Sequence, residues 1–373
     1  MGNEKKVSYI NVFKFAGAFI AFLIGSGFAT GQEILQYFTA YGMKGILAGI
    51  FTLVCLVFVG GDFIVTGYRE RFANPNDIYR YYCGKYIGTF YDYFAIAFLF
   101  MSYIVMIAGA GATLAQHYGI PVWYGCVGMA IVSAGTVMLG LNKIVDVIGT
   151  IGPAIVLFAV GIGLAAVLKD PGGIAAGAKM IEASEVELTK VGTGWLTSGL
   201  SYVGFSMLWL AAFLAAMGER AHSEKEAVIG TTLGAAGFVC GIIVMMLGLL
   251  ANLKAVAMTD IPSLILAEAI YPPIATVFSC IIVAGIYTTS VPLLWSVSAR
   301  FTKEGTRNFN LLTAVLAAVG CVIGLVLPFQ KIVNVIYGIN GYVGILLLVF
   351  MLVKLVRDHF TGKQSAAAKT VSR

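Results

Sequence analysis

The stretch LIGSGFATGQEILQYF, residues 23–38, decides how this chain folds, because it places polar residues inside a long apolar segment. Residues 25–27 read GSG, and glycine costs about 1 kcal/mol relative to alanine in a helix interior. Thr30, Gln32 and Glu33 follow directly, and such side chains are unfavourable in hydrocarbon unless they face a cavity or a partner. The stretch therefore predicts an interrupted membrane helix.

The composition predicts an all-α polytopic membrane protein. The chain has 373 residues, of which 59% are hydrophobic and 11% charged. Its apolar runs repeatedly exceed the roughly 20 residues that cross a bilayer core. No segment between them is long enough for a soluble domain of about 100 residues. We expect a single membrane domain over residues 1–360, followed by a cytoplasmic tail over 361–373.

Apolar runs and the breaker residues between them predict ten spans. The first is interpreted as a span and not as a secretory signal, since it outlasts an h-region of about 7 to 15 residues. The expected spans are 10–40, 43–68, 88–116, 121–140, 144–168, 195–218, 226–250, 273–299, 309–327 and 331–356. The two longest outer connections, 169–194 and 251–272, carry helix-like spacing and predict short surface helices.

The basic residues predict the orientation. The chain has 24 Lys and Arg residues, and few of them fall in the outer segments. Those few are Lys44, Lys169, Lys179, Lys190, Lys254 and Lys331. This bias places both termini in the cytoplasm, in a multi-pass protein of the cell membrane. The net charge of +6 is spread over short loops, so it indicates topology and lipid contact and no nucleic-acid partner.

Sequence patterns of enzymes and of metal or cofactor sites are missing from the chain. The six cysteines and three histidines show neither CxxC nor HExxH spacing, so no zinc site and no other cofactor is expected. No GxxxxGK[ST] motif is present, which argues against ATP as an energy source. No nucleophile and base can be paired from the sequence, so an enzyme is not predicted.

A second interruption is predicted in the sixth span, within LTSGLSYVGFSMLWL at residues 196–210. Its small and hydroxyl residues are Ser198, Gly199, Ser201, Gly204 and Ser206. The two predicted breaks lie half a chain apart. Because each repeat then holds five spans, an odd number, the second half enters the membrane with opposite orientation, giving inverted repeats over about 10–168 and 195–356.

The predicted breaks are interpreted as binding sites. An unwound helix leaves backbone groups unpaired in lipid, which is tolerated only where a ligand, an ion or water satisfies them. The half-helix that begins near Phe28 would direct its amides toward an anionic group such as a carboxylate. The carbonyls of Ala21 and Ile24, at the end of the inner half-helix, would suit a cation.

The eighth span supports a cation site with VAGIYTTSVPLL at residues 283–294. Thr288, Thr289 and Ser290 offer three consecutive hydroxyl groups, and Pro292 loosens the carbonyl one turn earlier. Hard oxygen ligands of this kind suit Na⁺. The alternative is that the hydroxyls hydrogen-bond to their own helix, as membrane helices allow.

The chain resembles the LeuT-fold amino acid-polyamine-organocation (APC) superfamily, and most closely its YkvI-like membrane proteins. The resemblance is carried by GSGFATGQE, by the GF pair of span six and by the hydroxyl run of span eight. The resemblance covers nearly the whole chain. It implies a LeuT-type 5+5 fold with helices 1 and 6 broken. It also implies a substrate-backbone site at Gly25, Ser26 and Gly27, closed by Gly204 and Phe205. The implied sodium site uses Ala21, Ile24, Gly285, Thr288 and Thr289, or Ile286 and Ser290 if the register shifts by one.

Other polar residues extend the candidate site. Glu33 has three possible roles: a counter-ion for a substrate amine, a proton carrier, or a structural partner for a neighbouring span. Tyr103 and Tyr202 could offer hydroxyls to a carboxylate, although packing is an alternative. Lys14 and Asp62 lie at comparable depth in adjacent spans, so we expect a gating ion pair, with snorkelling of Lys14 as the alternative. The candidate substrate residues are Gly25, Ser26, Gly27, Phe28, Thr30, Glu33, Tyr103, Tyr202, Gly204, Phe205 and Ser206.

The leading hypothesis is a secondary transporter that moves a small amino acid or related amine-containing solute by alternating access, in symport with Na⁺. Coupling to H⁺ through Glu33 is an alternative. A membrane receptor or sensor that binds a solute without moving it is another. The oligomeric state is left open.

Overall fold

A computed structural model describes residues 7–140 and 145–360 of the chain. For Ser26 and for residues 145–154 it describes the backbone alone, and the predicted tail 361–373 lies outside the described residues. Within those ranges every regular element is a helix. The prediction of an all-α protein is confirmed for this part of the chain.

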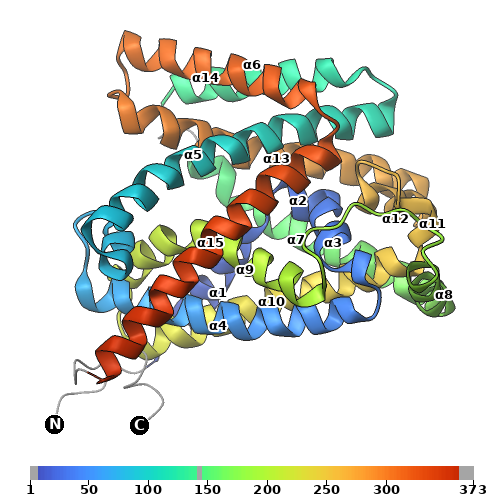
Figure 1. The fold of residues 1–373 in the computed structure, drawn as a ribbon. Coiled ribbons are helices and arrows are strands. Elements are labelled where there is room, and N and C mark those ends of the chain that lie inside the picture. The colour runs from blue at the N-terminus through green and yellow to red at the C-terminus, as the bar shows by residue number, and fades with distance from the viewer. Residues whose placement is uncertain (1–6, 141–144, 361–373) are drawn as a thin grey trace.

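The described helices are arranged as a bundle (Figure 1). In chain order they are α1 (Tyr9–Leu23), α2 (Ser26–Thr30), α3 (Gln32–Tyr37), the 3₁₀ turn η1 (Thr39–Tyr41), α4 (Lys44–Glu70), α5 (Asp77–Tyr118), α6 (Val122–Met138), α7 (Val145–Lys169), α8 (Pro171–Glu182), α9 (Trp195–Glu219), α10 (Glu224–Ala251), α11 (Leu253–Val256), α12 (Pro262–Ile270), α13 (Pro272–Phe301), α14 (Arg307–Val326) and α15 (Phe329–Phe360).

Within the described residues, seven helices are long and apolar enough to cross a membrane. The number rises to eight if residues 155–169 and α8, which meet at a bend of 93°, form one broken span. The apolar helices α1 and α6 are shorter, at 15 and 17 residues. The described part of the chain is therefore a multi-pass membrane protein. The short helices expected in the two long connections are present as α8, α11 and α12.

The first apolar segment is interrupted, as predicted. α1 ends at Leu23, and both Ile24 and Gly25 have extended backbone torsions. α2 then runs for five residues and ends at Gly31, whose φ of 80° lies in the left-handed region that glycine adopts without steric cost. The first span therefore consists of three short helices, separated at residues 24–25 and at Gly31.

The sixth predicted span is continuous, so the predicted break near Gly204 is wrong. α9 runs unbroken from Trp195 to Glu219. A Cβ atom added at Gly204 would collide with the Gly341 carbonyl oxygen, and one at Gly344 would collide with Gly204. The small residues of α9 therefore allow close packing on α15, the alternative role of glycine in membrane helices.

The bundle surrounds α9 and the broken segment. α4 and α15 pack along α9, α1 packs on α10, and α13 packs on α5 (Figure 1). α6 and α14 pack on each other beside α5. We call the end of the bundle that holds Ser8, Arg69, Glu224 and Lys354 the terminal end, because α1 begins there and α15 ends there. The opposite end, with α8, α11 and α12, is the far end.

Candidate functional site

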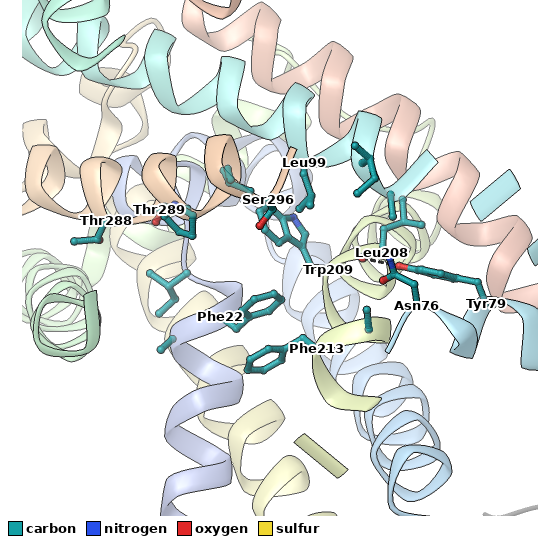
Figure 2. A pocket seen from close by; sticks show the side chains of 17 residues that line it. Phe22, Asn76, Tyr79, Leu99, Leu208, Trp209, Phe213, Thr288, Thr289 and Ser296 are labelled. Carbon is teal, nitrogen blue, oxygen red and sulfur yellow. Dashed lines mark hydrogen bonds between the residues drawn. The ribbon is translucent and has the colours of Figure 1, made fainter. Parts of the chain in front are cut away.

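A cavity of about 350 Å³ lies beside the break in the first span (Figure 2). Ala21 and Phe22 of α1, together with Ile24, form one wall, so the cavity lies on the terminal side of the break. The other walls are formed by α5, α9, α13 and the connection before α5. The cavity has the size of a small-molecule site.

Aromatic rings line much of the cavity. Phe22 and Phe213 stack with ring centroids 3.8 Å apart and nearly parallel planes (Figure 2). Trp209 meets Phe22 edge to face at 5.7 Å, and Tyr79 lies on the side of Asn76. Among the described residues that line the cavity, none is acidic. Ring faces of this kind attract organic cations.

Four of the residues predicted to bind sodium line this cavity: Ala21, Ile24, Thr288 and Thr289. The Thr288 and Thr289 hydroxyls donate to the Gly285 carbonyl oxygen at 3.0 and 2.9 Å. The Ser290 hydroxyl donates to the Tyr287 carbonyl at 3.0 Å. The hydroxyl run therefore makes the bonds within its own helix that were the alternative interpretation, while the lone pairs of Thr288 and Thr289 remain available to a ligand.

Glu33 is buried on the other side of the break and does not line the cavity. Its carboxylate accepts a hydrogen bond of 2.5 Å from the Tyr202 hydroxyl of α9. The same carboxylate lies against Gly27, where a Cβ atom would collide with it. Glu33 thus joins α3 to α9 and packs against α2.

Several other predicted substrate residues are packing residues in this structure. Phe28 stacks on Phe238 at 5.6 Å, and Phe205 stacks on Tyr337 at 4.9 Å. The Tyr103 hydroxyl is hydrogen-bonded to Ser133, away from the cavity lining. The Ser206 and Thr30 hydroxyls donate to carbonyls of their own segments. The side chain of Ser26 lies outside the described residues.

Hydrogen bonds cover the break on the far side. The Ser263 hydroxyl of α12 donates to the Ala29 carbonyl at 2.6 Å. The Gln32 amide donates to the Thr259 carbonyl at 2.6 Å, and Gln36 bonds to Gln32 and accepts from Asn334. Burial raises the pKa of Asp260, in the connection before α12, while a hydrogen bond from the Gln330 backbone lowers it. α12 and α15 thus hold the far side of the break closed.

The structure has an ionic network at the terminal end that the sequence did not predict. Asp92 is buried and accepts hydrogen bonds from Asn76 at 2.9 Å and from Arg300 at 2.9 Å, with Arg80 at 3.3 Å. Asn76 also lines the cavity. The available signal was an aspartate inside an apolar run. The sequence does not show that a residue as distant as Arg300 is its partner.

The structure does not bring Lys14 and Asp62 together. Asp62 is buried on α4 and accepts a hydrogen bond from the Tyr82 hydroxyl. Lys14 is exposed and lines a different pocket between α1 and α9. The predicted gating pair is therefore not formed in this conformation, because the two side chains leave their helices toward different neighbours.

The sequence comparisons find two relatives, of which one is described as a membrane protein. No family model matches the sequence. The chain is 25% identical over 337 residues to the uncharacterized protein YyaD of Bacillus subtilis (strain 168), covering 88% of this chain and 93% of YyaD. It is 22% identical over 354 residues to the uncharacterized membrane protein YkvI of the same organism, covering 91% and 94%.

The fold resembles that of a manganese transporter from Eremococcus coleocola, seen in crystal structures of mutant forms of that transporter. The TM-score is 0.55 and the sequence identity 12%, with 95% of this chain and 80% of that chain covered. The relatives and the shared helical fold together support a multi-pass membrane protein.

Proposed function

We propose that this protein is a secondary transporter of a small amine-containing solute, with the aromatic cavity beside the first-span break as the solute site. The observation that carries the proposal is the position of the cavity of about 350 Å³. It meets the interrupted backbone at Ile24, and the opposite side of the break is closed by hydrogen bonds from α12 and α15. Interrupted backbone at membrane depth is tolerated where it lines a cavity. The rings of Phe22 and Trp209 suit the ammonium group of an amino acid or amine.

The span arrangement that fits this proposal has ten spans in two inverted halves, as in the LeuT fold. The broken segment α1–α3 and the helices α4, α5, α6 and α7 would form the first half. The second half would comprise α9, α10, α13, α14 and α15, with α8 and α12 on the far surface. The bias of Lys and Arg then places the terminal end in the cytoplasm. In that orientation the hydrogen bonds from α12 and α15 would close the outer side, and the state would be inward-facing.

Na⁺ is the proposed coupling ion. Its ligands would be the carbonyls of Ala21 and Ile24 with the hydroxyls of Thr288 and Thr289, all from residues at the cavity wall. The Gly285 carbonyl, which already accepts from both threonines, orients these hydroxyls. Among the described residues no group of three or more His, Cys, Asp or Glu side chains could hold a metal ion, so we favour an organic solute over the divalent ion of the structural relative.

Coupling to H⁺ is the second candidate, and the burial of Glu33 favours it. The carboxylate is 2% exposed and its hydrogen-bond partner is a neutral tyrosine hydroxyl. A buried carboxylate without a cationic partner is costly in its charged form, which is the arrangement of a proton carrier.

Uptake of radiolabelled amino acids and amines into proteoliposomes tests the proposal. We expect uptake that depends on a Na⁺ gradient, that falls at least ten-fold in Thr288→Val/Thr289→Val, and that persists in Ser290→Ala. Uptake driven by a pH gradient and abolished in Glu33→Gln would favour H⁺ coupling instead. Binding of a solute in a thermal-shift assay with no uptake under either gradient would indicate a sensor and contradict transport.

A further inference from the structure

A second pocket, of about 420 Å³, lies between α1 and α9 at the terminal end. Asn11 and Lys14 of α1 line one side. Arg220 and His222, which follow the end of α9, line the other. Three side chains that can carry positive charge therefore face one pocket.

Nearby carboxylates balance these basic groups only in part. Among the side chains that the structure describes, Lys14, Arg220 and His222 take part in no ion pair. Of the carboxylates in the first turn of α10, one pairs with another basic residue and the other, Glu226, lies beside the pocket. Glu224 pairs with Arg69 at 2.5 Å, and Glu226 accepts from the Ser8 backbone N–H at 2.6 Å and from Asn11. The three basic side chains of the pocket thus outnumber the neighbouring carboxylate of Glu226.

The remainder of the pocket is apolar. The lining is completed by Phe15 and Ala18 of α1 and by Phe213 and Met217 of α9. The neighbouring side chain of Phe13 is 72% exposed, as an acyl-chain contact in a membrane would be. A ligand that fits here combines an anionic group with a hydrocarbon portion.

The depth of Lys14 also suits a membrane ligand. Nine residues separate Lys14 from the end of α1 at Leu23, which corresponds to roughly 14 Å at about 1.5 Å per residue. Half of a hydrocarbon core is about 15 Å thick. If the break lies near mid-bilayer, the Lys14 ammonium reaches the level of the lipid phosphates.

We propose that this pocket binds the phosphate headgroup of an anionic phospholipid, with Lys14, Arg220 and His222 contacting the phosphate and the apolar wall contacting an acyl chain. Basic pockets between membrane helices on the cytoplasmic side have this chemistry. Phe213 lines both this pocket and the aromatic cavity, so a bound lipid touches the Phe22–Phe213 stack from behind.

Native mass spectrometry of the purified full-length protein in neutral detergent tests this site. Dioleoylphosphatidylglycerol and dioleoylphosphatidylcholine are titrated in parallel. We expect the anionic lipid to bind at least ten-fold more tightly. In the double variant Lys14→Gln/Arg220→Gln, the affinity for the anionic lipid should fall about 25-fold, because each basic residue contributes roughly a factor of five. Binding of phosphatidylcholine should be unchanged.

Two variants and one soluble anion complete the test. Lys303→Gln/Arg307→Gln removes two basic residues outside the pocket and should alter the affinity less than two-fold. Lys14→Arg/Arg220→Lys keeps the charge and should retain binding, which separates a lost site from a misfolded protein. An equal loss in the Lys303 control, or full competition by inorganic phosphate, would overturn the proposal.

Discussion

The first span and α9 carry similar small-residue patterns, yet one is broken and the other is continuous. In the first span, a Cβ atom at Gly25 would meet only the Met106 methyl group, at 3.4 Å. In α9, a Cβ atom at Gly204 would collide with the backbone of α15. Glycine in the broken span thus leaves room beside the backbone, whereas glycine in α9 lets two helix backbones touch. The surroundings, and not the glycines themselves, decide the difference.

Gly204→Ala should have the largest effect on stability. The added methyl group meets backbone atoms of Gly341 and Ile345, which cannot move as a side chain can. Overpacking of this kind costs about 1–3 kcal/mol, and we expect about 2 kcal/mol after the gain in helix propensity. Denaturation in mixed detergent micelles measures it.

The matched control is Gly338→Ala on α15, where no atom lies within 4 Å of the added methyl group. It should be neutral or slightly stabilising. Equal effects of the two variants would contradict the packing role of Gly204.

Gly31→Ala should have the second-largest effect on stability. Its φ of 80° strains an L-residue by about 1–2 kcal/mol, and the methyl group would lie 3.1 Å from the Ser263 backbone nitrogen. We expect a loss of about 1.5 kcal/mol. The control is Gly119→Ala, because Gly119 has a φ of 65° and no atom within 4 Å of an added methyl group. The difference between the stability losses of the two variants therefore measures the contact with α12.

Ser263→Ala should have a smaller effect of about 1 kcal/mol, because it removes one buried hydrogen bond, that to the Ala29 carbonyl. It should also raise labelling of a cysteine placed at Thr30, since the far-side cover is loosened. Ser206→Ala removes a bond within α9 and serves as the control. Unchanged labelling would mean that α12 does not hold the break closed.

Gly25→Ala should have the smallest effect on stability, below about 0.5 kcal/mol, because its torsions suit any residue and the nearest atom is a flexible methyl group. If the solute docks on this backbone, uptake should nevertheless fall several-fold. A variant with normal stability and normal uptake would remove Gly25 from the solute site.

The sequence was most informative where a local pattern sufficed. The GSG run and its polar neighbours identified the first break, and the apolar runs identified the long helices. The predicted break in α9 was wrong, since a packing glycine and a breaking glycine differ only in their contacts with α15, more than 130 residues away. The cluster at Asp92 was hidden for the same reason, because Arg300 reaches it across the fold.

The candidate site was partly predictable. Ala21, Ile24, Thr288 and Thr289 do share one cavity, but Glu33 and Tyr202 pair with each other behind it. The aromatic wall of Phe22, Trp209 and Phe213 was not predicted. All three residues lie in apolar spans, and a sequence does not show which apolar side chains of a span line a cavity.

The short length of α2 has a consequence for the way the protein moves. Five residues form little more than one helical turn, and the surrounding elements, not the helix itself, hold such a segment in shape. Amide protons of residues 27–31 should therefore exchange with deuterium sooner than those in the middle of α4 or α9, although these residues are buried. A solute that docks against this segment would slow the exchange, so its protection pattern reports occupancy directly.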